Sequence, residues 1–147
     1  MYAFTYNNAA SGDEASQSLR KCSEGHVLAG GMSLIPTMKL RLSSPGELID
    51  LNGLPELSGI ERDGDTLTIG AMTRHAEVAA SAEVAGAIPA LAALAGGIGD
   101  VQVRNRGTIG GSICFNDPAA DYPAGLVGLG ATVVTNERSI AADDFFT

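Results

Sequence analysis

With 147 residues, the chain has the length of one ordinary domain or of two small ones. Hydrophobic residues make up 45% of the sequence, which supplies a core and excludes a disordered chain. The 17 acidic residues against 9 basic ones give a net charge of -8, which repels a nucleic-acid backbone and argues against nucleic acid as a partner. A phosphate-bearing ligand would therefore be small and held mainly by backbone N–H groups.

Targeting signals and metal-binding patterns are missing from the sequence. The opening stretch MYAFTYNN lacks the charged and apolar regions of a signal peptide, and residues 85–99 are too short and too interrupted to span a bilayer. We therefore expect a cytoplasmic protein without a membrane span. Cys22 and Cys114 are the only cysteines, so the sequence predicts two packed thiols and no disulfide, zinc or iron–sulfur site.

The first 56 residues alternate between strand and helix patterns. Strands are expected at residues 3–6, 26–30 and 47–51, and helices at residues 11–25 and 33–42. Ser11 and Ser33 are the expected N-caps, Gly25 is the expected stop of the first helix, and the strand at 26–30 has a buried composition. Residues 1–56 are thus predicted to form a βαβ-like lobe with a short parallel sheet.

From residue 57 onward the pattern changes to hairpins and short Ala-rich helices. Hairpins are expected around Asp63-Gly64 and Asn136-Glu137, and Thr73 is the expected cap of a helix that runs to Ser81. Ser81 and Pro89 then open helices that stop at Gly96-Gly97. Residues 103–115 have a strand composition interrupted by glycines, and residues 116–124 read as a loop or a capped helix start. We interpret residues 57–147 as a second α+β lobe.

Two glycine pairs, Gly30-Gly31 and Gly110-Gly111, are each followed closely by a serine, Ser33 or Ser112. A turn of small residues before a helix exposes consecutive backbone N–H groups and lets a phosphate approach closely. One such turn is most simply explained by tight packing, but two of them offer the two donor clusters that a pyrophosphate needs.

The glycine pairs match no standard nucleotide-binding loop. Both the Walker pattern and the Rossmann pattern G-x-G-x-x-G are absent, although Asp50 lies 20 residues after Gly30, as a Rossmann domain would have it. An NAD-binding domain, or a non-catalytic assembly module with structural glycines, therefore remains an alternative.

Four stretches in order, LAGGMSLIPTMKLRL, IGAMTRHAEVAAS, IGDVQVRNRGTIGGSICFNDPAADYPA and IAADDFF, resemble the FAD-binding medium subunit of the molybdenum hydroxylases. This family includes bacterial carbon monoxide dehydrogenase and the flavin domain of xanthine dehydrogenase. The resemblance implies a two-lobed α+β fold of the vanillyl-alcohol-oxidase-like (PCMH-type) class. It covers only the first half of such a subunit, so we expect the fold to be incomplete at the C-terminus, after Phe145-Phe146.

The resemblance also implies the cofactor, its contacts and the partner subunits. The residues implied to bind FAD are Val27, Leu28, Ala29, Gly30, Gly31, Met32, Ser33, Leu34, Ile98, Thr108, Ile109, Gly110, Gly111, Ser112 and Asp121. No catalytic residue and no metal ligand are expected in this chain. The implied partners are a large subunit with the molybdenum cofactor, where substrate is oxidised, and a small subunit whose 2Fe-2S clusters relay electrons. FAD would then pass these electrons to an external acceptor.

Other polar residues receive structural interpretations. His75 is expected on a helix surface and His26 on the protein surface. Asp117 is expected to cap a turn, and Arg104 and Arg106 to be solvated or to pair with a partner subunit.

Overall fold

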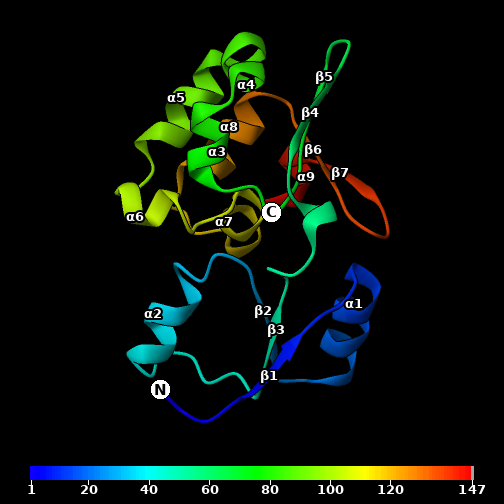
Figure 1. Ribbon diagram of the computed structural model, residues 1–147, viewed down its shortest axis with the longest axis vertical. Coiled ribbons are helices and arrows are strands. Elements are labelled where there is room, and N and C mark those ends of the chain that lie inside the picture. Colours follow the sequence, from blue (N-terminus) through cyan, green and yellow to red (C-terminus); the bar gives the residue numbers. More distant parts are fainter. Residues whose placement is uncertain (147) are drawn as a thin grey trace.

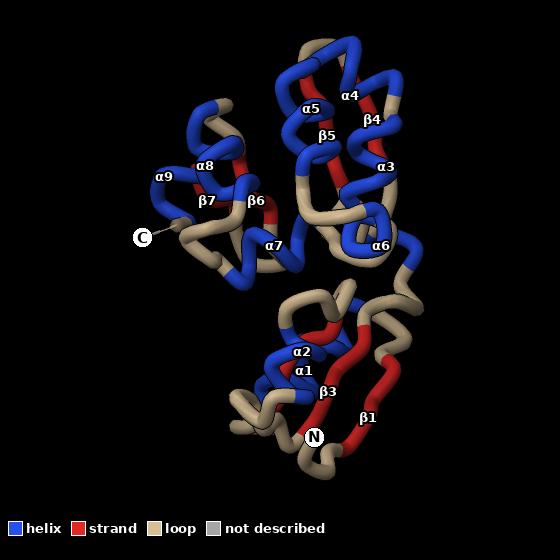
Figure 2. The backbone as a smooth tube through the Cα atoms, turned by 90° about the vertical axis from the view of Figure 1, so that its left-hand side faces the viewer, coloured by secondary structure: helices blue, strands red, loops and turns tan. Residues whose placement is uncertain are grey.

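The computed structural model describes residues 1–146, which form two lobes stacked along the long axis (Figure 1). The lower lobe contains the N-terminus and the strands β1, β2 and β3. The upper lobe contains a group of short helices and two β-hairpins, and Figure 2 shows the same separation from the side. The predicted division between residues 56 and 57 stays a prediction, although the architecture changes from parallel to antiparallel strands in this region.

The lower lobe is built from β1 (Thr5–Asn8), α1 (Gly12–Lys21), β2 (Gly25–Leu28), α2 (Leu34–Lys39) and β3 (Glu47–Asp50). The three strands are parallel and lie in the order β1-β3-β2, with Leu48 opposite both Tyr6 and His26. The predicted short parallel sheet is therefore confirmed, with β1 two residues later than expected.

The two helices of this lobe cover opposite faces of the central strand. Successive residues of a strand point to opposite faces. Accordingly, Leu48 packs with Met38 of α2, whereas Ile49 packs with Ala15 of α1. Figure 1 shows α1 and α2 on either side of the sheet. The burial of β3 between two helices fixes the position of the loop that follows β2.

The prediction that residues 26–30 form a buried strand is wrong for its first part. His26 and Val27 are exposed on β2, which is an edge strand, and its first buried side chain is Leu28. The predicted surface position of His26 is confirmed. Ser11 caps α1 as predicted, since its side chain accepts a hydrogen bond from the N–H of Glu14, whereas the side chain of Ser33 makes no capping hydrogen bond.

The upper lobe begins with a short 3-10 helix at Pro55–Leu57. Its strands pair as two antiparallel hairpins, β4 (Ile60–Asp63) with β5 (Thr66–Ile69) and β6 (Thr132–Val134) with β7 (Ser139–Ala141). Its helices are α3 (His75–Ala80), α4 (Ala82–Ala87), α5 (Pro89–Gly97), α6 (Val101–Arg104), α7 (Ile109–Phe115), α8 (Asp121–Gly128) and α9 (Ala142–Phe145). Both predicted hairpins and the helices opened by Ser81 and Pro89 are confirmed.

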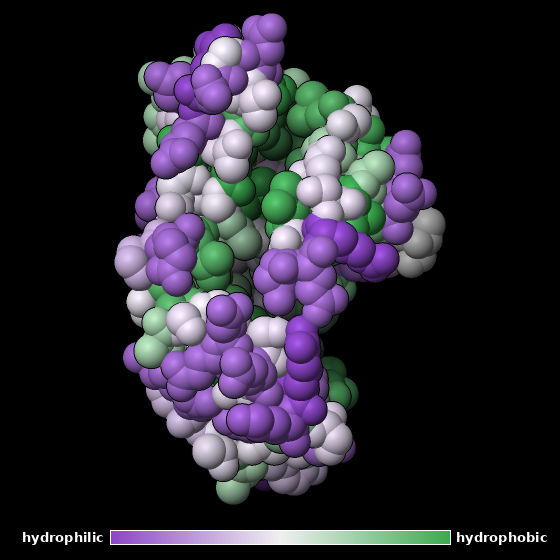
Figure 3. Space-filling view, turned by 90° about the vertical axis from the view of Figure 1, so that its right-hand side faces the viewer, coloured by the Kyte–Doolittle hydropathy of each residue, from purple (hydrophilic) through white to green (hydrophobic). Residues whose placement is uncertain are grey.

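One core holds the upper lobe together. Val78, Val84 and Leu91 from α3, α4 and α5 pack with Ile113 of α7 and with Tyr122 of α8, which is fully buried. Half-buried hydrophobic residues of both hairpins cover this core. In Figure 3, hydrophobic side chains gather in a recess in the upper half of the face, bordered by hydrophilic ones.

The strand composition of residues 103–115 is misleading, because α6 and α7 occupy most of this stretch. The side chains of Asp100 and Thr108 cap these helices by accepting from the N–H groups of Val103 and Gly111. Asn116 then ends α7 in the left-handed conformation. The β-branched residues of this segment thus pack in helices, and the glycine pair lies in the first turn of α7 rather than in a loop.

The predicted cap at Thr73 is also wrong. Arg74 occupies the N-cap position of α3, and the hydroxyl of the buried Thr73 instead donates to the carbonyl of Gly59 and accepts from its N–H. Within residues 1–146, no helix is long and apolar enough to cross a membrane.

Candidate functional site

A cavity of about 940 Å³ lies between the lobes, near the upper end of the size range of cofactor sites, roughly 300–1,000 Å³. Of the residues predicted to bind FAD, its wall contains Val27, Ala29, Gly30, Gly31, Met32, Ser33, Leu34, Ile98, Thr108, Gly110, Gly111 and Ser112. The fold therefore brings both glycine pairs, which are 80 residues apart, to one cavity.

Three of the predicted residues lie elsewhere. Leu28 and Ile109 are buried in the cores of the lower and upper lobes. Asp121 is exposed at the start of α8, next to Ala120, which does line the cavity. The structure thus places Leu28 and Ile109 in packing positions and Asp121 at the edge of the site.

The loop that follows β2 presents unused hydrogen-bond donors. Among residues 1–146, none accepts a hydrogen bond from the backbone N–H groups of residues 30–34. Gly31 has a φ of 75°, in the left-handed region that favours glycine. A left-handed residue within such a turn gathers successive N–H groups into a concave site for anions. Met32 and Ser33 are exposed, so a bound anion can accept from these N–H groups in place of water, and this loop can hold a phosphate.

Gly30 has a different role within the same loop. A Cβ atom at this position would collide with the carbonyl oxygen of Arg106 and lie 2.8 Å from the Cα of Gly107. The backbones of the two glycine-containing segments therefore approach directly at Gly30. Gly30 thus lets the backbones of the two lobes come into contact, as the packing interpretation predicts. Gly31 instead determines the conformation of the loop.

The second glycine pair presents no unused donors. The N–H groups of Ile109 and Gly110 donate to the carbonyls of Thr73 and Ala71, and Gly111 donates to the side chain of Thr108. The N–H of Ser112 continues the helix by donating to the carbonyl of Thr108. The expectation that both glycine pairs expose consecutive N–H groups thus holds for the first pair only.

Gly110 is required by packing. A Cβ atom there would lie 2.6 Å from both the Cβ and the carbonyl oxygen of Ala71. At Gly111 the nearest atom would be the capping hydroxyl of Thr108, at 2.8 Å. The second glycine segment therefore lets α7 pack closely against the residues that precede α3.

His75 is buried in the cavity wall, which corrects its prediction as a surface residue. Its ring packs against Tyr122 with the ring centres 5.3 Å apart, and it fills the space where a side chain at Gly107 would lie. Within residues 1–146, neither His75 Nδ1 nor the Tyr122 hydroxyl has a hydrogen-bond partner. Burial lowers the pKa of His75, which favours a neutral imidazole. The alanine-rich sequence around His75 gave no indication that this side chain is buried.

Three further residues at or near the cavity had structural interpretations, of which two change and one holds. Arg104 is half-buried and donates to the carbonyls of Ile98 and Gly99, so it is not a solvated side chain. Cys114 is exposed at the cavity wall rather than packed. Asp117 accepts from the N–H of Ala119 and so stabilises a turn, as predicted.

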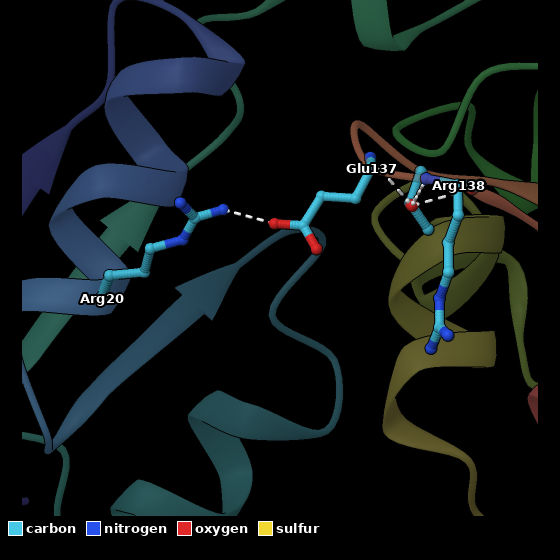
Figure 4. Close-up of polar contacts among 4 residues, drawn as sticks. Arg20, Glu137 and Arg138 are labelled. Atoms are coloured by element: carbon cyan, nitrogen blue, oxygen red, sulfur yellow. Dashed lines mark hydrogen bonds and ion pairs between the residues drawn. The ribbon is translucent and has the colours of Figure 1, made fainter.

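An ion pair crosses between the lobes. Arg20 of α1 contacts Glu137 at the tip of the β6–β7 hairpin, at 2.5 Å, although their side chains are 64% and 67% exposed (Figure 4). The turn around Glu137 is ordered by Thr135, whose hydroxyl accepts from the N–H groups of Glu137 and Arg138. Because Leu19, the neighbour of Arg20, lines the cavity, this pair lies close to the site.

The geometry agrees with comparisons to known proteins. Residues 2–147 match the family described as the FAD binding domain in molybdopterin dehydrogenase. The chain belongs to this family. It is 46% identical to the carbon monoxide dehydrogenase medium chain of Hydrogenophaga pseudoflava over 84% of this chain and 45% of that protein. It is 41% identical to the glyceraldehyde dehydrogenase medium chain of Sulfolobus acidocaldarius over 97% of this chain and 52% of that protein.

Solved structures of family members have the same fold. Carbon monoxide dehydrogenase from Hydrogenophaga pseudoflava, in a form that lacks the Mo-pyranopterin moiety of its cofactor, matches with a TM-score of 0.96 at 44% identity, over 99% of this chain and 53% of that chain. Quinoline 2-oxidoreductase from Pseudomonas putida 86 matches with a TM-score of 0.91 at 35% identity, over 96% of this chain and 51% of that chain. The predicted two-lobed FAD-binding fold is confirmed, and the chain spans about half the length of these relatives.

The NAD-binding alternative does not fit this family domain. A Rossmann domain would use an acidic residue at the position of Asp50 to bind a ribose. Here Asp50 is buried and accepts hydrogen bonds from Tyr6 and Asn52. Its carboxylate is therefore occupied by hydrogen bonds within the protein.

Proposed function

We propose that this chain holds FAD in a molybdenum-containing hydroxylase or dehydrogenase, and that the loop at residues 30–34 binds the FAD pyrophosphate. The run of unused N–H groups at Gly30–Leu34, on the wall of the cavity between the lobes, supports this function most strongly. The net charge of -8 also favours a site in which backbone donors, rather than a basic patch, neutralise the phosphates.

The remaining residues of the site would orient the cofactor. Ile98 and Thr108 lie on the upper wall, and Val27 and Met32 contribute apolar contacts from the lower lobe. When bound, FAD supplies the electron-transfer chemistry, while the protein binds, orients and shields it. Asp121 would reach the site from the start of α8, next to the cavity wall.

The proposed partners follow from the related complexes. A large subunit with the molybdenum cofactor would oxidise substrate, and a small subunit with 2Fe-2S clusters would deliver electrons to the flavin site. An external acceptor would then receive them. We place this assembly in the cytoplasm.

The test is the substitution Gly31→Val in the intact flavoprotein. Valine at a φ of 75° costs roughly 1–2 kcal/mol in the backbone, and each phosphate hydrogen bond lost with the loop geometry costs a further roughly 1.5–3 kcal/mol. We expect FAD affinity to fall by about a hundredfold or more. The measurement is flavin per polypeptide after purification, with circular dichroism to follow folding.

Gly130→Val is the control for the backbone cost, whereas a Cβ atom at Gly31 would in addition lie 3.0 Å from Ile35 Cδ1. Gly130 also has a positive φ, 61°, and no atom lies within 4 Å of the position of its Cβ. This variant carries a similar backbone cost away from the cavity, and we expect it to retain FAD. Stoichiometric FAD in Gly31→Val would refute the assignment of the phosphate site.

A further inference from the structure

Asn52, just after β3, connects the sheet to the loop proposed to bind phosphate. Its side-chain Nδ2 donates to the carbonyl oxygen of Ala29 at 3.0 Å and to Asp50 Oδ1 at 2.6 Å. The backbone N–H of Asn52 donates to the same Asp50 oxygen at 2.9 Å. Asn52 is therefore held in one orientation by Asp50 while it holds Ala29.

Asp50 is a firm anchor for this contact. It is 7% exposed, and its second oxygen accepts a hydrogen bond from the hydroxyl of Tyr6 on β1. Burial alone would raise the pKa of Asp50, but the hydrogen bonds from Tyr6 and Asn52 outweigh burial and lower it, with a further contribution from Arg106. The carboxylate thus stays ionised and keeps its three donors, from Tyr6 and Asn52, in place.

The contact to Ala29 determines the direction of the next donor. The carbonyl of Ala29 and the N–H of Gly30 belong to one planar trans peptide, so they point in opposite directions. With the carbonyl fixed towards Asn52, the N–H of Gly30 must point away from it. This N–H is the first of the unused donors of residues 30–34, and the left-handed Gly31 then turns the chain.

We infer that Asn52, anchored by Asp50, is a positioning residue that orients the Ala29–Gly30 peptide for phosphate binding. This inference rests on the proposed function of the loop. Asn52 is not among the residues that line the cavity between the lobes, so it would act through this peptide. Without its amide, the peptide can rotate and remove a donor from the phosphate.

The experiment compares Asn52→Leu with Asn105→Leu in the intact flavoprotein, after removal of FAD. Asn105 is a matched control, since its Nδ2 also donates to a backbone carbonyl, that of Val101, at 2.7 Å. Dissociation constants are measured for FAD and for ADP, a probe with the pyrophosphate but without the flavin ring. We expect Asn52→Leu to weaken both ligands by the same factor, about tenfold, and Asn105→Leu to change each by less than about twofold.

Other results would overturn the inference in recognisable ways. If Asn52→Leu binds FAD normally while Gly31→Val loses it, the positioning role is wrong and the phosphate loop stands. If both bind FAD normally, the proposed function fails as well. If both Asn variants lose the same amount of affinity for FAD and ADP, in parallel with a loss of stability of the FAD-free proteins, then Asn52 has only a general structural role. If Asn52→Leu does not fold, Asn52→Ala, which removes the donor and adds neither bulk nor charge, replaces it with the same expected loss.

Discussion

The two glycine segments of the cavity share the pattern of a glycine pair followed by a serine, but they use their backbones differently. In the first segment the N–H groups of residues 30–34 find no acceptor among residues 1–146. In the second segment the N–H groups of residues 109–112 all donate to other parts of the protein. The first segment can therefore bind an anion directly, whereas the second shapes the opposite wall.

This difference shows that a glycine pair has two separable physical uses. Gly31 permits a backbone conformation that side chains disfavour, while Gly30 and Gly110 permit close approach of another segment. A binding role and a packing role can thus lie at adjacent residues. Substitutions that separate binding from stability test the distinction.

Gly110→Ala should have the largest effect on stability. Its added Cβ would lie 2.6 Å from the backbone oxygen of Ala71, which cannot move without shifting the start of α3. We expect the free energy of unfolding of the FAD-free protein to fall by about 1–3 kcal/mol. Urea denaturation measures this change. A fully stable Gly110→Ala variant would contradict the packing role of the second segment.

A change at His75 should alter the pH dependence of the upper lobe. Because burial lowers the pKa of His75, the unfolded chain binds a proton at a higher pH than the folded chain does. Stability should therefore decrease as pH falls below about 6.5, the usual pKa of histidine. His75→Leu, which cannot titrate, should flatten this dependence between pH 7 and pH 5 in urea denaturation. An unchanged slope would show that His75 does not cause this pH dependence.

The smallest effect is expected where the lobes meet through Arg20 and Glu137. Because both side chains are largely exposed, reversing either charge should change the unfolding free energy by no more than about 1 kcal/mol. The double reversal Arg20→Glu with Glu137→Arg should restore what each single change loses, and high salt should remove the difference. Single variants that match the wild type at low salt would show that the pair contributes nothing.

The sequence predicted the elements whose signals are local. Ser11 and Ser81 cap their helices as expected, and the turns at Gly64 and Glu137 join hairpins. Residues 103–115 were predicted wrongly because β-branched side chains favour strands, although the caps Asp100 and Thr108 were present in the sequence as helix signals.

The different roles of the two glycine segments could not be predicted from the sequence. Whether an N–H remains unused depends on distant acceptors such as the carbonyls of Ala71 and Thr73, which only the tertiary fold brings to Gly110 and Ile109. The contact from Asn52 to Ala29 likewise spans 23 residues. The burial of His75 depends on Tyr122, 47 positions later. Long-range packing decides these points.

Hydrogen exchange at the two glycine segments, with and without FAD, tests the central claim most directly. Bound FAD slows exchange everywhere by stabilising the fold, so the comparison is between segments of the same protein. The unused N–H groups of residues 30–34 should exchange quickly without FAD and at least about tenfold more slowly with it, beyond this general slowing. Residues 109–112, whose donors are already bonded, should show only the general slowing. Selective protection of residues 109–112, with residues 30–34 unchanged, would contradict the assignment of the phosphate site to the first glycine loop.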